Sequence, residues 1–107
     1  MVSVGFLIRL HAKPGQEQAV AAFLDGAVPI VEGEPATTAF FAIRFGPSEF
    51  GIFNAFPNDA GRQAHVTGRA AAALFAQAGA LLTEAPAIEP VEIIGSKLPD
   101  RALSATV

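Results

Sequence analysis

A chain of 107 residues is long enough for one globular domain, and 51% of its residues are hydrophobic while only 16% are charged. Its net charge of −3 and its scattered lysine and arginine residues argue against nucleic-acid binding, because phosphate binding needs a concentrated positive face. The absence of cysteine excludes disulfide bonds, thiolate nucleophiles and cysteine-based metal sites, and it suits a reducing cytoplasm, where we expect the protein to lie.

We expect no signal peptide and no membrane span. The N-terminus lacks a basic stretch followed by a long apolar run, and the longest apolar segment, 70–82, is too short to cross a bilayer. Such a high apolar content in so small a domain predicts that a ligand, a second copy of the chain, or both cover part of its surface.

The first half of the chain predicts a strand, a helix and a second strand. Apolar residues recur at every second position of 2–12, which is typical of a strand, and the segment 13–15 ends it with Pro and Gly. Apolar residues of 20–31 fall on one face of a helix, which the segment 33–35 terminates. Residues 37–45 are rich in aromatic and β-branched side chains and predict the second strand.

The second half predicts a hairpin partner and two helical segments. A short turn after residue 45 makes 50–56 the antiparallel partner of the preceding strand. Asn58 is suited to cap a short helix that ends near Thr67, and apolar residues at helical spacing predict another helix over 69–82.

A last strand is predicted over 88–98, and Pro90 within it indicates an edge position in the sheet. The resulting order, β-α-β-β-α-β, is that of the ferredoxin-like α+β fold, with a four-stranded antiparallel sheet and its helices on one face. We therefore expect residues 1–98 to form one domain of this fold and residues 99–107 to form a C-terminal tail.

Both faces of the predicted sheet are apolar. In the second strand Phe41 and Ile43 point to one face while Phe40 and Ala42 point to the other. Helices on one face would leave the other bare, and a bare face in contact with water would carry polar residues at alternate positions. We therefore expect a homodimer in which two bare faces meet through an isologous interface, forming a closed or half-closed dimeric α/β barrel.

Three residues between positions 50 and 65 could share a cavity and form a small-molecule site. His65 is either a general base, since imidazole titrates near neutral pH, or a histidine that packs on its helix. Asn54 lies on an apolar strand face, so its amide must bond either to backbone groups or to a ligand oxygen. Phe56 is either a core residue or a wall of the pocket.

Further candidates for binding a substrate lie on the strands and the first helix. Arg9 and Arg44 have apolar neighbours on their strand faces, so they could bind an oxyanion or instead reach a sheet edge or a carboxylate. Phe23, on the apolar face of the first helix, is a candidate wall residue. We expect no metal site, because only two histidines are present, on different elements, and His11 is expected to be solvated.

These features resemble the antibiotic biosynthesis monooxygenase family of the dimeric α/β-barrel superfamily. The resemblance rests on the strand and helix joined by 13–15, on the strand that ends at Phe56, and on His65 nine positions later, and it covers residues 4–99. It implies the ferredoxin-like fold, a dimer, and a pocket between sheet and helices in which aromatic phenols and quinols react with O₂ without metal or flavin. His65 matches a helix histidine of the family, Phe56 a position that often holds Trp, and Asn54 one that often holds an acid.

The resemblance therefore implies a cofactor-independent monooxygenase that acts on a small phenolic or quinol-type aromatic molecule. His65 and Asn54 would carry the chemistry, while Phe56, Phe23, Arg9 and Arg44 would bind the substrate. An alternative is a non-catalytic, small-molecule-binding or stress-related dimer with the same fold, which the absence of Trp and Tyr favours. A second alternative is haem binding or degradation, with His65 as a ligand of the iron.

Overall fold

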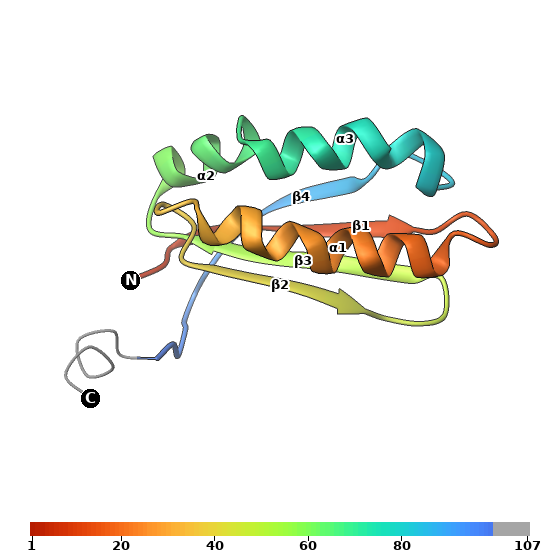
Figure 1. The fold of residues 1–107 in the computed structure, drawn as a ribbon. Helices are drawn as coiled ribbons and strands as arrows, with labels where there is room; N and C mark the ends of the chain where they lie inside the picture. The colour runs from red at the N-terminus through yellow and green to blue at the C-terminus, as the bar shows by residue number, and fades with distance from the viewer. Residues whose placement is uncertain (100–107) are drawn as a thin grey trace.

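In the computed structural model, which describes residues 1–99, four strands and three helices follow the predicted order. The elements are β1 (Val4–His11), α1 (Glu17–Glu32), β2 (Ala39–Arg44), β3 (Glu49–Phe56), α2 (Asp59–Val66), α3 (Arg69–Leu81) and β4 (Ala87–Glu92). Figure 1 shows all three helices on the same side of the sheet. The α+β ferredoxin-like fold predicted from the sequence is therefore confirmed.

The sheet has the strand order β2-β3-β1-β4, and every neighbouring pair is antiparallel. The central strand β1 pairs with β3 on one side and with β4 on the other, so that Ile8 lies opposite both Ile52 and Ile88. β4 is an edge strand, as Pro90 indicated, since a proline nitrogen has no hydrogen to donate to a further strand.

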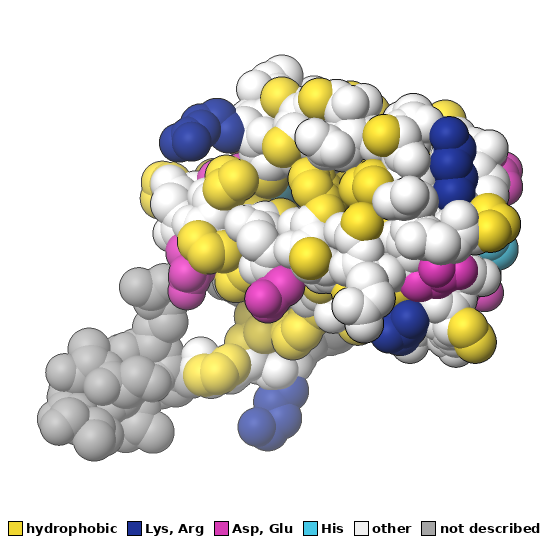
Figure 2. Space-filling view, turned by 45° about the vertical axis from the view of Figure 1, so that its right-hand side comes forward, with side chains coloured by type: hydrophobic (Ala, Val, Ile, Leu, Met, Phe, Trp, Pro, Cys, Tyr) yellow, Lys and Arg dark blue, Asp and Glu magenta, His cyan; other side chains and the backbone are white. Residues whose placement is uncertain are grey.

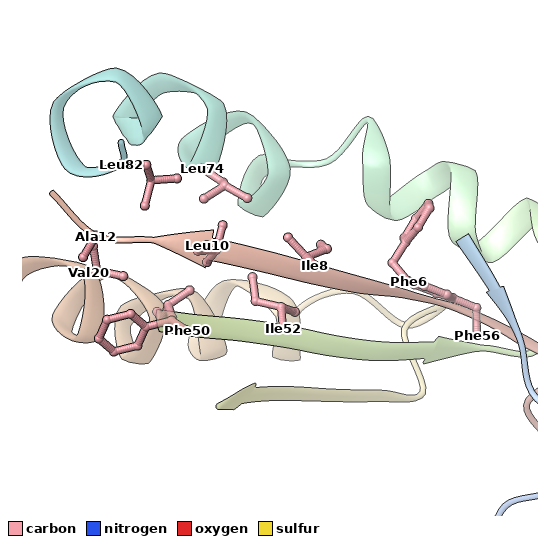
Figure 3. Packing of buried hydrophobic residues seen from close by; sticks show 11 residues of the cluster. Phe6, Ile8, Leu10, Ala12, Val20, Phe50, Ile52, Phe56, Leu74 and Leu82 are labelled. Carbon is pink, nitrogen blue, oxygen red and sulfur yellow. The ribbon is translucent and has the colours of Figure 1, made fainter. Parts of the chain in front are cut away.

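The core lies between the sheet and the helices. Alternate residues of β1 and β3, including Leu10, Phe50 and Ile52, are buried on the side that α1 and α3 cover. Figure 3 shows Leu74 and Leu82 lying across this layer from the strand residues. The alternate apolar residues predicted for the strands and the apolar faces predicted for the helices thus pack together in one continuous cluster.

Two local features set the positions of the helices. Gly15 has a φ of 87°, which glycine adopts without strain, and it lets the chain turn from β1 into α1. Asn58 caps α2 as predicted, because its side-chain oxygen accepts a hydrogen bond from the backbone N–H of Gly61 at 3.0 Å.

The predicted end of the last strand is wrong. β4 stops at Glu92, six residues before the expected position 98. Its only partner, β1, begins at Val4, which lies opposite Glu92, and the Ile93 N–H bonds to the Ser3 carbonyl at 2.9 Å. Beyond this point the sheet offers no further strand to pair with, so an apolar sequence is not sufficient for a strand. The tail expected at 99–107 lies, from residue 100 on, outside the described residues.

No helix covers the opposite face of the sheet, which we call the bare face, and residues 93–98 line a pocket on part of it. Phe41 is 53% exposed there, and Ile43 and Phe45 are exposed beside it. Phe40, which precedes Phe41, points to the helical side and packs against the core. None of the helices in residues 1–99 is long and apolar enough to cross a membrane.

Candidate functional site

A buried asparagine lies at the centre of the candidate site. Asn54, on β3, is 0% exposed and points to the helical side of the sheet. Its Oδ1 accepts a hydrogen bond from the backbone N–H of Phe6 at 3.0 Å, and its Nδ2 lies 3.3 Å from Nε2 of His65. The Phe6 N–H therefore fixes the orientation of the amide, with its NH₂ group directed at the imidazole.

The other ring nitrogen of His65 bonds to a carboxylate. His65 Nδ1 lies 2.6 Å from Oε1 of Glu34, which also accepts a hydrogen bond from the Thr37 hydroxyl at 2.8 Å. Because the Asn54 NH₂ group can only donate, Nε2 must accept, and the ring proton therefore lies on Nδ1 and is donated to Glu34. A carboxylate that fixes a histidine tautomer in this way leaves the opposite nitrogen as a base.

Three separate elements bring these side chains together. His65 lies in the last turn of α2 and is buried. Glu34 follows α1 in the loop that leads to β2, and its Oε2 is buried with no hydrogen-bond partner among residues 1–99. A Cβ atom at Gly68, the residue before α3, would lie 3.3 Å from this oxygen. The carboxylate thus packs at the start of α3, where the positive end of the helix dipole favours negative charge.

An apolar cavity of about 50 Å³ lies beside the imidazole. Its walls come from the sheet, α1, α2 and α3, and they include Ile8, Ile52, Phe23 and Leu74 as well as the His65 ring. Figure 2 shows hydrophobic side chains gathered between α1 and α3. Three further wall residues, Val66, Phe75 and Ile88, are also exposed on the surface.

Four of the predicted site residues meet here. His65 and Phe23 line the cavity, and Asn54 is bonded to His65 from below. Phe56 is a core residue with 0% exposure, and its ring centroid lies 5.5 Å from that of His65. The sequence left open whether the Asn54 amide bonds to backbone groups or to a ligand oxygen. In the structure its oxygen bonds to the backbone, while its nitrogen bonds to His65.

The two arginines lie elsewhere. Arg44 bonds through its guanidinium group to the carbonyls of Gly46 and Pro47 in the turn after β2 and covers the ring of Phe50 at 4.8 Å. Arg9 points to the bare face, where its guanidinium group lies 4.8 Å from the centre of the Phe45 ring. Neither side chain lines the cavity.

Glu34 is the residue of this site that sequence reasoning missed. It lies 31 positions before His65 in the chain, within the segment read only as the end of a helix. The available signal was a carboxylate in an otherwise apolar and small-residue connection, which is weak because most such carboxylates are solvated. Within residues 1–99, no group of three or more His, Cys, Asp or Glu side chains is placed to hold a metal ion.

Comparison with known proteins identifies relatives among solved structures. A protein of unknown function from Nitrosomonas europaea, NE2512, is 53% identical and superposes with a TM-score of 0.92, over 94% of this chain and 97% of that protein. Rv0793 from Mycobacterium tuberculosis is 19% identical, with a TM-score of 0.78 over 88% of this chain and 97% of the other.

A structure described as an antibiotic biosynthesis monooxygenase is also similar, at 15% identity and a TM-score of 0.75, over 86% of this chain and 99% of that one. At such low identity the likeness shows the fold, and it confirms the resemblance seen in the sequence at that level. No protein-family model and no curated protein matches the chain.

Proposed function

Since the chain belongs to the same family as NE2512 of Nitrosomonas europaea and has the fold of an antibiotic biosynthesis monooxygenase, we propose that it is a cofactor-independent monooxygenase. Its substrate is a small phenolic or quinol-type aromatic molecule, and its oxidant is O₂. One observation carries the proposal, which is the hydrogen-bonded chain from Glu34 through His65 to Asn54 at the wall of an apolar cavity.

The reaction needs no external electrons. An electron-rich phenolate gives electrons to O₂, a ring carbon forms a bond to one oxygen atom, and the second oxygen atom leaves as water. One phenol and one O₂ thus give one quinone and one water, and the aromatic substrate supplies all four electrons. The protein has to remove the phenolic proton, hold the anion and exclude bulk water.

His65 is the base in this scheme. A phenolic hydroxyl displaces the Asn54 NH₂ group, whose 3.3 Å contact to Nε2 is long, and transfers its proton to that nitrogen. The released amide N–H then donates to the phenolate oxygen, while the Glu34 carboxylate at Nδ1 stabilises the imidazolium ion that has formed. Phe6 keeps the amide oriented throughout, because its N–H remains bonded to Oδ1.

We place the aromatic ring at the exposed apolar rim of the cavity. Val66, Phe75 and Ile88 are 40%, 52% and 40% exposed and come from α2, α3 and β4. A flat apolar ring that covers them removes hydrophobic surface from water, and this burial supplies the binding energy. A ring bound at the rim can then direct one edge into the cavity, toward the His65 imidazole that lines it.

Oxygen consumption tests the proposal. An oxygen electrode with a panel of phenols and hydroquinones should record uptake above the autoxidation rate, and His65→Ala should lower kcat by about 10²–10⁴-fold, the usual contribution of a general base. His11→Ala is the matched control, because the His11 side chain is 50% exposed on β1, pairs with Glu49 and does not line the cavity. Uptake no faster than autoxidation, or equal losses in both variants, would contradict the proposal.

A second candidate function is a non-catalytic small-molecule binder. The observation that favours it is that both nitrogens of His65 already have partners, at 2.6 Å and 3.3 Å. A binder would show a raised Tm with phenols in the same panel but no oxygen consumption. We do not carry haem binding forward, because the iron lies at the centre of a porphyrin and the cavity of about 50 Å³ beside His65 cannot admit so large a ring.

We also propose that the protein is a homodimer joined through the bare face. Phe41, Ile43 and Phe45 expose aromatic and aliphatic surface there, and no helix covers them. Sedimentation should give twice the 11.0 kDa chain mass. Phe41→Lys should shift the particle to one chain mass, whereas Val66→Lys, at a site on the helical side, should not. A monomeric wild-type protein would refute this interface.

A further inference from the structure

The cavity beside His65 is too small for an aromatic ring. Its volume is about 50 Å³. An apolar protein cavity of about 150 Å³ binds benzene or xenon, whereas one water occupies about 30 Å³ in the liquid. The space therefore suits a molecule of very few atoms, and an aromatic substrate would have to stay at its rim.

The polar groups around this cavity leave nothing for water to bind. Among the described residues that line it, His65 alone has a polar side chain. Before a phenol binds, Nδ1 is bonded to Glu34 and Nε2 to Asn54, so neither nitrogen is left for a water in the cavity. A water in this space would have only other waters at the exposed rim as partners, so the apolar walls favour an apolar guest over water.

We propose that this cavity is a binding site for molecular oxygen. O₂ is small and apolar, so it prefers an apolar space to water and is held by dispersion contacts with the walls. This inference rests on the proposed function, in which O₂ is the second substrate. Occupied, the cavity stores O₂ against the imidazole edge, directly behind the place where the phenolate forms.

Small side chains at the start of α3 create the space. Ala70 and Ala71 line the cavity, in the same helix as Leu74. A leucine at position 71 adds three carbon atoms to the wall and occupies much of the volume. Ala72 is exposed and does not line the cavity, so Ala72→Leu makes the same chemical change on the same helix without filling it.

Methyl NMR under O₂ pressure tests the site with the ligand itself, because paramagnetic O₂ broadens and shifts the signals of nearby methyl groups. Ile52 and Val31 are both 5% exposed, but only Ile52 lines the cavity. We expect a larger O₂ effect at Ile52 than at Val31, in the wild type and in Ala72→Leu alike. In Ala71→Leu the excess at Ile52 should disappear.

Xenon supplies an independent measurement. Its affinity for the wild-type protein, followed by ¹²⁹Xe NMR, should fall by about tenfold or more in Ala71→Leu, equal to about 1.4 kcal/mol or more, and should not change in Ala72→Leu. If Ala71→Leu does not fold, as judged by circular dichroism, the smaller Ala71→Val should show a partial loss. Equal O₂ effects at Ile52 and Val31, or xenon binding that Ala71→Leu leaves intact, would overturn the inference.

These measurements contain no phenol and require no turnover. If the protein binds O₂ in the cavity but consumes none with the phenol panel, the gas site is supported and the proposed function is wrong. If it consumes O₂ but shows no excess effect at Ile52, the proposed function is supported and the gas site is wrong.

Discussion

Replacement of Asn54 by alanine is the perturbation for which the structure gives the clearest magnitude. The change removes the acceptor of the Phe6 N–H at 3.0 Å and the donor to His65 Nε2 at 3.3 Å, both within the buried interior. A buried polar group that loses its partner costs about 1–3 kcal/mol, so the two together predict a loss of about 2–6 kcal/mol in the free energy of unfolding. The total free energy of unfolding of a small domain is about 5–15 kcal/mol, so the variant should fold only marginally.

Asn58→Ala is the matched control, because it removes an asparagine oxygen that accepts a backbone N–H at the same distance, 3.0 Å, but at a helix cap that water can reach. Loss of such a cap costs about 1 kcal/mol. Urea titrations followed by circular dichroism, at one protein concentration, measure both free energies of unfolding. If Asn54→Ala lowers the free energy of unfolding no more than Asn58→Ala does, the two buried hydrogen bonds of Asn54 do not stabilise the fold as we argue.

Two glycine substitutions should act in opposite directions in the same titration. Gly5→Ala should destabilise by about 1–3 kcal/mol or more, because its Cβ would lie 2.1 Å from the Asn54 backbone oxygen and would force β1 away from β3. Gly26→Ala lies in the middle of α1, where the new Cβ would meet no atom within 4 Å beyond its own stretch of helix, and it should stabilise by about 0.5–1 kcal/mol through the lower backbone entropy of the unfolded chain. A destabilising Gly26→Ala would show that α1 depends on flexibility there.

The elements that the sequence predicted well are those with a regular period. The alternation of β1 and the apolar stripe of α1 arise from local geometry, and a single stretch of sequence carries that geometry completely. The end of β4 was predicted wrongly because a strand also needs a neighbour, and the length of β1 decides where that neighbour stops. No pattern within 88–98 contains this information.

The candidate site divides in the same way. Asn54 and His65 lie 11 positions apart on a strand and the next helix, so the local order of elements was enough to suggest that they meet. Glu34 reaches His65 only because the loop after α1 packs against α2, with Ala36 beside Gly61, and this packing is a property of the whole fold. Its role could be seen only once the three elements were placed together.

The composition of the cavity wall affects how well the site resists oxidation. Reduced oxygen species attack the sulfur of cysteine and methionine first among common side chains. The chain has no cysteine, and its single methionine is Met1, at the exposed N-terminus. With no tyrosine or tryptophan either, the walls contain no thiol, thioether, phenol or indole. A reduced oxygen species formed when an electron escapes from the substrate to O₂ would meet none of these groups in the walls, and the site would survive many turnovers without damaging itself.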